Sequence, residues 1–363
     1  MTDVIVIGAG ISGLVCAQRL RQAGYSVLVL EKSRGVGGRV ATRRLYGTCA
    51  DHGACYLKPK GELFNQLIEI LRDRHIIQLW TDTVYQHQST TGLIVQSSAT
   101  CYTAPDGMSA IAKFLVQKLN LHITNRVVKV NLTSENSWCL TLENNEQFHA
   151  KALLIAIPAP QAADLLTPLG ENLLGTEFLK NLQSVEFNPC ISVMAGFPHN
   201  SQPLPHWQAL TFNDHPDLGW IGLDSSKRLQ LEKPHFVVQS SANFAQQHLD
   251  TEDLQPVGNY MLKKAAAYLD LSWLENPEWA TVHRWRYAFP RTPLDVACLP
   301  AQTPLPLVCS GDWCGGSLIE GAMLSGLAAA QEIDGQMGNQ LSADRDFLDF
   351  VREFSTNSYT IDN

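Results

Sequence analysis

Glycines and an acid near the N-terminus have the spacing that binds a dinucleotide. Gly8, Gly10 and Gly13 form a GxGxxG run between a β-branched segment and a segment with helical periodicity. In this arrangement the first glycine permits a tight turn, the second lets a pyrophosphate approach the backbone, and the third lets the helix pack close to the strand. The helix N-terminus then faces the diphosphate, and an acid about twenty residues on accepts hydrogen bonds from the ribose diol. The residues expected to form this site are Gly8, Gly10, Ile11, Ser12, Gly13 and Glu31.

A second glycine pair follows the acid and favours FAD over NAD as the dinucleotide. Residues 34–39 read RGVGGR, in which a cation, Arg39, follows Gly38. Glycines allow this loop to lie against a cofactor, and Arg39 can give the pyrophosphate a charge-assisted hydrogen bond. An ordinary flexible loop is the alternative, although it has no need of this spacing after Glu31. We therefore predict an FAD site to which Lys32, Gly38 and Arg39 contribute.

Motifs spread along the chain resemble those of the glycine-doublet flavoproteins, which include the flavin amine oxidases. Within this group the likeness is strongest to the renalase branch. The resemblance implies an FAD-dependent oxidoreductase. The matching segments are residues 4–13, 31–39, 50–54, 285–287, 311–313 and 320–322.

The resemblance assigns further residues to the cofactor. In similar proteins the acid at Asp312 hydrogen-bonds the ribityl or pyrophosphate region, and the helix that follows points its N-terminus at the flavin pyrimidine. A helix N-terminus there stabilises the negative charge that develops when the ring is reduced. A role for Asp312 as a helix N-cap is compatible with this assignment. The other residues implied are Gly53, Val128, Glu320, Gly321 and Ala322, with the adenine held by the backbone of Val128.

Three residues are candidates for the chemistry itself. His52 resembles a residue that passes beside the isoalloxazine, where it could be a flavin neighbour or a proton donor, because an imidazole titrates near neutral pH. A structural hydrogen-bonding role for His52 is the alternative. Arg286 and Tyr287 lie beside Trp285, where they could offer charge and stacking to an aromatic, anionic substrate. Ordinary packing between domains would explain them equally well.

The resemblance also implies a reaction. Renalase-like enzymes oxidise aberrant dihydro isomers of NAD(P) by moving a hydride to flavin N5 and then to O2, with release of H2O2. This is the leading hypothesis, with a dihydronicotinamide dinucleotide and O2 as partners. A flavin amine oxidase acting on a small amine is the alternative, which the lack of a Tyr in residues 313–317 weakens. A flavin-binding scaffold or sensor without turnover is an alternative of another class, and desaturation of an isoprenoid or porphyrin-like substrate is a further one.

The pattern of strands and helices that must position these residues predicts an α/β fold. Nearly continuous apolar runs are typical of buried parallel strands, and a helical pattern follows the first run. Shorter runs broken by turn residues predict antiparallel strands in an inserted domain. Parallel strands are expected at 4–7, 25–30, 152–157 and 307–309, antiparallel strands within 80–102 and 188–240, and helices at 11–23, 61–75, 160–166 and 252–269.

The domain organisation expected from these elements is discontinuous. A Rossmann-type FAD-binding domain should comprise residues 1–60, 101–160 and 295–363. An inserted α+β substrate domain with an antiparallel sheet should comprise residues 61–100 and 161–294.

Composition narrows the partners and the compartment. The net charge of -8 argues against a nucleic-acid partner, because phosphate binding needs a basic face. No apolar run reaches the roughly 20 residues of a membrane helix, and the N-terminal sequence has no basic leader, so a soluble cytoplasmic protein is expected. Nine scattered cysteines without a CxxC pair fit reduced thiols. We expect no metal site and a non-covalent flavin.

Overall fold

The first βαβ unit folds as the sequence predicts. The computed structural model describes residues 1–88, 94–199, 203–230, 233–316, 318–341 and 344–355. Strand β1 (Thr2–Ile7), helix α1 (Ile11–Gln22) and strand β2 (Val27–Leu30) follow one another, and the two strands pair in parallel. All of β2 and the last four residues of β1 are buried, as expected for strands covered on both faces.

An eight-stranded sheet surrounds this unit and forms the predicted Rossmann-type layer. Strand β10 (Gln147–Ile155) pairs in parallel with β1, and β17 (Leu307–Cys309) pairs in parallel with β10. The predicted apolar strands therefore share one sheet. The remaining strands are β7 (Asn120–His122) beside β2, β16 (Leu299–Pro300) beside β17, and the antiparallel β9 (Trp138–Leu142) and β8 (Val127–Leu132), which continue from β10.

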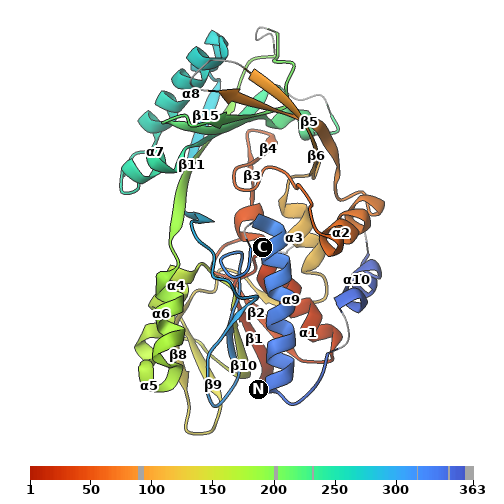
Figure 1. Ribbon diagram of the computed structural model, residues 1–363, viewed down its shortest axis with the longest axis vertical. Coiled ribbons are helices and arrows are strands. Elements are labelled where there is room, and N and C mark those ends of the chain that lie inside the picture. The colour runs from red at the N-terminus through yellow and green to blue at the C-terminus, as the bar shows by residue number, and fades with distance from the viewer. Residues whose placement is uncertain (89–93, 200–202, 231–232, 317, 342–343, 356–363) are drawn as a thin grey trace.

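Helices cover both faces of this sheet (Figure 1). Val4 and Val6 of β1 join the apolar cluster on one face, and Ile5 and Ile7 join the cluster on the other. The first cluster receives α1, α2 (Glu62–Asp73), α3 (Ser109–Leu115), α9 (Leu318–Gln336) and α10 (Asp344–Arg352). The second receives α4 (Ala159–Leu166), α5 (Glu171–Leu174) and α6 (Thr176–Ser184).

These contacts bear on the domain limits. Helices α2 and α6 pack on the first sheet, although the sequence predicts that residues 61–100 and 161–294 belong to the substrate domain. Their amphipathic faces fit either sheet, so sequence periodicity does not choose between them. The residue limits of the two domains stay a prediction.

A second, seven-stranded sheet forms the other half of the molecule (Figure 1). Its neighbouring strands are antiparallel except for the parallel pair β12 and β5. Helices α7 (Ala242–Gln247) and α8 (Gln255–Leu269) cover one face. The predicted antiparallel sheet is therefore present, in the order β15 (Trp279–Pro290), β11 (Phe187–Gly196), β14 (His235–Ser240), β13 (Leu218–Leu223), β12 (Ala209–Asn213), β5 (Gln78–Gln88) and β6 (Ile94–Thr103).

Short elements connect the two halves. A hairpin of β3 (Thr42–Leu45) and β4 (Thr48–Asp51) rises from the first sheet toward the second (Figure 1). The 3-10 helices are η1 (Gly38–Val40), η2 (Thr167–Leu169), η3 (Asp224–Lys227) and η4 (Ser272–Glu275). None of the described helices has the length and apolar composition needed to cross a membrane.

Buried charges fasten this hairpin to the second sheet. Lys227 Nζ lies 3.3 Å from Asp51 Oδ2 and 2.5 Å from Asp224 Oδ1, and all three side chains are fully buried. The Arg228 guanidinium pairs with both carboxylates. Burial alone would raise the pKa of Asp224, but the neighbouring cations, Lys227 foremost, hold it well below its usual value. We call Asp51, Asp224, Lys227 and Arg228 the buried charge cluster.

Candidate active site

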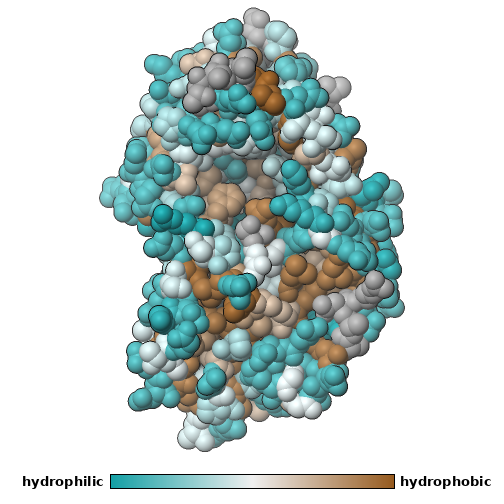
Figure 2. Space-filling model, in the orientation of Figure 1, coloured by the Kyte–Doolittle hydropathy of each residue, from teal (hydrophilic) through white to brown (hydrophobic). Residues whose placement is uncertain are grey.

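A cavity of about 2300 Å³ lies between the two sheets and brings the predicted residues together. Figure 2 shows the surface hollowed there, with apolar residues inside the hollow. Sites for one drug-sized ligand occupy about 300–1,000 Å³, so this cavity has room for a dinucleotide and a second ligand. Every predicted site residue except Gly13 lines it, namely Gly8, Gly10, Ile11, Ser12, Glu31, Lys32, Gly38, Arg39, His52, Gly53, Val128, Arg286, Tyr287, Asp312, Glu320, Gly321 and Ala322.

The three glycines of the N-terminal turn serve different purposes. Gly8 has a φ of +106°, and a Cβ there would lie 2.5 Å from Ala156 O, so no other residue fits. A Cβ at Gly13 would lie 2.1 Å from Gly8 O. Gly13 therefore lets α1 approach the turn and has no surface in the cavity. A Cβ at Gly10 would meet no protein atom within 4 Å, because Gly10 faces the cavity.

Glu31 is held in place by the turn that it closes. Its Oε2 accepts a hydrogen bond of 2.8 Å from Ala9 N, and its Oε1 accepts one of 2.8 Å from Ser33 N. Gly37 N donates to Ala9 O at 2.8 Å, which joins the second glycine pair to the first turn. Each carboxylate oxygen has a further lone pair. The buried acid can thus accept hydrogen bonds from a ribose while it orders the backbone around the cavity.

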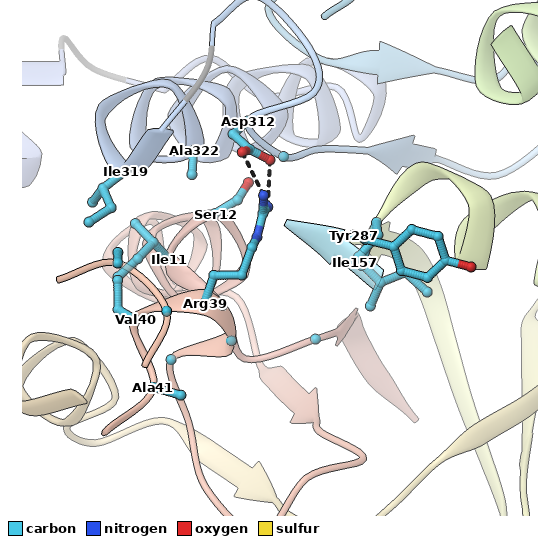
Figure 3. Close-up of a pocket in the computed structure, with 18 of the residues that line it drawn as sticks. Ile11, Ser12, Arg39, Val40, Ala41, Ile157, Tyr287, Asp312, Ile319 and Ala322 are labelled. Carbon is cyan, nitrogen blue, oxygen red and sulfur yellow. Dashed lines mark hydrogen bonds and ion pairs between the residues drawn. The ribbon is translucent and has the colours of Figure 1, made fainter. Parts of the chain in front are cut away.

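Arg39 and Asp312 form an ion pair with each other (Figure 3). Arg39 Nη1 donates to Asp312 Oδ2 at 2.8 Å, and Nη2 donates to Asp312 Oδ1 at 2.5 Å. Nη1 also donates to Ala288 O in β15 at 2.9 Å. The sequence predicts that each side chain contacts the cofactor, but not that they are partners. The pair joins three distant segments at the cavity wall, and the cofactor contacts of both residues stay predictions.

Glu320 has a partner that the sequence does not suggest. Its carboxylate accepts hydrogen bonds from Gly61 N at 2.7 Å and from Lys60 N at 3.1 Å. Gly61 is the N-cap of α2, where a negative charge is favourable. Glu320 therefore ties α9 to α2. A Cβ at Gly321 would lie 2.1 Å from Gly316 O, so this glycine allows the preceding loop to fold back on α9.

Two helix N-termini face the cavity. Ile11 and Ser12 of α1 and Ile319 and Ala322 of α9 line it together (Figure 3). Each helix N-terminus carries a partial positive charge and attracts an anionic group. One suits a diphosphate and the other the pyrimidine end of a flavin, and the open face of Gly10 leaves space for the diphosphate. The residues present therefore fit FAD.

Three aromatic side chains form a cluster on the side of the cavity next to the second sheet. The His52 and Trp285 rings stack with centroids 5.2 Å apart, and His283 meets both edge-on at 4.7 and 4.5 Å. His52 O accepts hydrogen bonds from Trp285 Nε1 at 2.8 Å and from Ser192 Oγ at 2.7 Å. All three rings line the cavity. We call His52, His283 and Trp285 the aromatic cluster.

Both imidazoles of the aromatic cluster are neutral near pH 7. Burial, His283 and Arg43 lower the pKa of His52 to about 3. Burial, Arg43 and Arg284 lower the pKa of His283 to about 4. His52 Nδ1 is buried without a hydrogen-bond partner among the described residues. His52 can therefore give or accept a hydrogen bond at neutral pH, but it is not an imidazolium proton donor.

The two other catalytic candidates differ in position. Side chains alternate along a strand, so His283 and Trp285 point to one face of β15 and Arg286 points to the other. Arg286 Nη2 donates to Asp250 Oδ1 at 2.8 Å and to Leu249 O at 3.2 Å. Tyr287 lies at the cavity wall, where its ring meets Phe187 edge-on at 5.7 Å. Substrate contact by Arg286 has no support from these hydrogen bonds, and both catalytic roles stay predictions.

The charge of the cavity wall is opposite to that of the whole chain. The chain has 27 Lys and Arg residues and 35 Asp and Glu residues. Among the described residues, the cavity wall has 11 Lys and Arg residues and five Asp and Glu residues. An excess of cations in a concave site concentrates anions there. The wall therefore suits a ligand with several negative charges.

Val128 in β8 and Gly53 lie at different parts of the cavity wall. Val128 is about half exposed, as a residue that offers its backbone to a ligand would be. Gly53 O accepts a hydrogen bond from Gln239 Nε2 at 2.8 Å, and a Cβ at Gly53 would lie 2.0 Å from Arg39 O. Gly53 is therefore required for close packing of the segment after His52.

Comparisons with known proteins agree with this geometry. A model of NAD(P)-binding Rossmann-like domains matches residues 6–72, and a model of flavin-containing amine oxidoreductases matches residues 69–334. Mouse renalase is 24% identical over 354 residues, which cover 90% of this chain and 97% of renalase. Polyamine oxidase 4 of rice is 50% identical over 55 residues, covering 15% of this chain and 11% of that protein.

Solved structures share the fold. Putrescine oxidase bound to putrescine superimposes with a TM-score of 0.69 at 14% identity and covers 92% of this chain and 98% of its own. The chain belongs to the flavin-containing amine oxidoreductase family and is an FAD-dependent oxidoreductase that resembles renalase.

Proposed function

We propose that this protein oxidises dihydro isomers of NAD(P), with O2 as the electron acceptor. Two cations beside the aromatic cluster, Arg43 and Arg284, carry the proposal, because a dinucleotide substrate brings a diphosphate whereas a small amine brings a positive charge. The match to renalase along almost the full length of both chains supports it. The volume of the cavity also speaks against a scaffold whose flavin face is blocked.

Bound FAD would supply a two-electron acceptor, so that a dihydronicotinamide, a proton and O2 yield the oxidised nicotinamide and H2O2. The chain supplies position and electrostatics. The neutral imidazole of His283 and the indole of Trp285, which packs on His52, offer flat aromatic surfaces to a planar ring. Oriented contacts of this kind supply much of the rate in hydride transfer.

Anaerobic mixing tests the proposal. The purified, FAD-loaded protein is mixed with the 2- and 6-dihydro isomers of NAD and NADP, with ordinary NADH and with putrescine, and the oxidised flavin band is followed. We expect rapid bleaching with a dihydro isomer, and return of the band with stoichiometric H2O2 when air is admitted. An oxidised band that persists with every dihydro isomer would refute the substrate assignment.

An amine is the second candidate substrate, because the family is named for amine oxidation and one similar structure is a putrescine oxidase. A protonated amine would meet a wall with more cations than acids. The same experiment separates the two, since bleaching by putrescine alone would favour the amine. A cytoplasmic location and the absence of nucleic-acid partners remain proposals.

A further inference from the structure

Arg43 differs from the other arginines around the aromatic cluster because its side chain has neither an ion pair nor a hydrogen bond among the described residues. Arg284 also lacks an ion pair, but its guanidinium donates hydrogen bonds to His248 O and Thr251 O. Arg39 is paired with Asp312, and Arg286 is paired with Asp250. Arg43 lines the cavity and is half-buried. A partly desolvated guanidinium without a carboxylate is costly unless a ligand supplies the anion.

The hairpin holds Arg43 in a fixed direction. Its neighbour Thr42 pairs with Asp51 across the hairpin, and Thr42 Oγ1 donates to Asp51 Oδ1 at 2.7 Å. Asp51 is in turn anchored by the buried charge cluster and accepts a hydrogen bond of 2.8 Å from Met108 N. Because side chains alternate along β3, Arg43 points away from this anchor. Arg43 pairs across the hairpin with Ala50, two residues before His52, and it lines the same cavity as His52 and His283. Its charge lowers the pKa of both histidines, in agreement with this position.

We propose that Arg43 forms an anion subsite that binds a phosphate of the substrate while the substrate's nicotinamide ring lies against the aromatic cluster. This assignment rests on the proposed function. A guanidinium can bind phosphate oxygens through two parallel hydrogen bonds. The flat neutral rings beside it suit a heteroaromatic ring, so the two features together select a ring that is linked to a phosphate.

The subsite is distinct from the place expected for the flavin diphosphate. That diphosphate should lie at the N-terminus of α1, beside Gly10. Arg43 follows the glycine pair and lies on the hairpin that rises to the second sheet. An Arg43 variant should therefore keep FAD and lose affinity for the second ligand.

Two ligands that differ by one phosphate test the subsite. Nicotinamide mononucleotide and nicotinamide riboside are each titrated into the FAD-loaded protein, and the shift in the flavin absorption spectrum reports binding. We expect the wild type to prefer the mononucleotide by about 10- to 100-fold, the contribution of a charge-assisted hydrogen bond. In Arg43→Gln this preference should fall to about twofold or less. Arg43→Lys should retain an intermediate preference, because a lysine keeps the positive charge but lacks the two parallel N–H donors of a guanidinium.

A matched control separates local from general effects. Arg291→Gln makes the same change of charge at a surface residue that pairs with Glu186 outside the cavity, and it should leave the preference unchanged. Equal preferences in wild type and Arg43→Gln, or a wild type that does not prefer the mononucleotide, would overturn the subsite. Loss of FAD from Arg43→Gln in ultrafiltration would also overturn it, since Arg43 would then belong to the flavin site.

The proposed function can fail separately. If no dihydronicotinamide bleaches the flavin but Arg43→Gln abolishes the preference for the mononucleotide, the subsite stands and the reaction is wrong. If bleaching occurs with the wild type and the preference is unaffected by Arg43→Gln, the reaction stands and the subsite is wrong.

Discussion

Replacing Lys227 by methionine should destabilise the protein far more than the same change at the surface. Lys227 is fully buried between Asp51 and Asp224, and its ammonium also lies 5.1 Å from the centre of the Trp80 ring. Methionine fills much of the same volume but carries no charge. Among the described residues that pair with both carboxylates, only Arg228 would then remain as a permanently charged cation. Removing one partner from a buried ion pair costs about 3–5 kcal/mol, against a total stability of about 5–15 kcal/mol.

The assay is urea unfolding of the FAD-loaded protein, followed by far-ultraviolet circular dichroism and by release of flavin fluorescence. The control is Lys233→Met, since Lys233 pairs with Glu278 at 2.9 Å in an exposed position. Exposed pairs contribute about 0–1 kcal/mol. The reasoning is refuted if the two variants unfold at midpoints that differ by less than the equivalent of about 1 kcal/mol. Adding Asp224→Asn to Lys227→Met should recover part of the loss, because it removes one of the orphaned charges.

Other predictions follow from the site. Gly13→Ala should lower FAD affinity at least about tenfold in ultrafiltration, because its Cβ would lie 2.1 Å from Gly8 O, whereas Gly335→Ala in α9 has open space and should retain FAD. Because the pKa of His52 is lowered in the folded protein, the unfolded chain binds a proton at a higher pH than the folded chain does. The contribution of His52 to stability is therefore complete above about pH 6.5 and is lost as the pH falls toward 3. In His52→Gln the urea unfolding midpoint should depend less on pH between about pH 4.5 and 6.5, and an unchanged pH dependence would contradict this. Burial raises the pKa of Cys314 to about 12, so its thiol stays protonated and should not add to the flavin as a nucleophile. Acid precipitation should leave all the yellow colour in the supernatant, and colour in the pellet would show a covalent link.

The parts of the fold that could be predicted are those with local signals. The glycine turn and Glu31 lie within one βαβ unit, so the strand, turn and helix around them could be predicted from spacing alone. The apolar strands were recognisable because burial on both faces removes the usual alternation. Placement of α2 and α6 was not predictable, since an amphipathic helix shows that it has a buried face but not which sheet receives it.

Within the site, the sequence does not predict which residues distant along the chain pair with each other. Arg39 and Asp312 were each identified, but they are 273 residues apart and nothing local indicates that they meet. His283 was missed although a signal was present. Residues 283–287 alternate His, Arg, Trp, Arg, Tyr, and the period of two assigns His283 and Trp285 to the same face and Arg286 to the opposite one.

The ion pair between Arg39 and Asp312 also constrains when the protein can acquire its flavin. During synthesis the glycine turn emerges early, but β17, Asp312 and α9 are made only after the entire second sheet. A ribosome-bound chain that stops near residue 300 lacks one wall of the cavity, and its first sheet lacks β17. Loading with FAD is therefore expected late in translation or after release, and the exposed edge of β10 is the surface that a chaperone would have to shield until then.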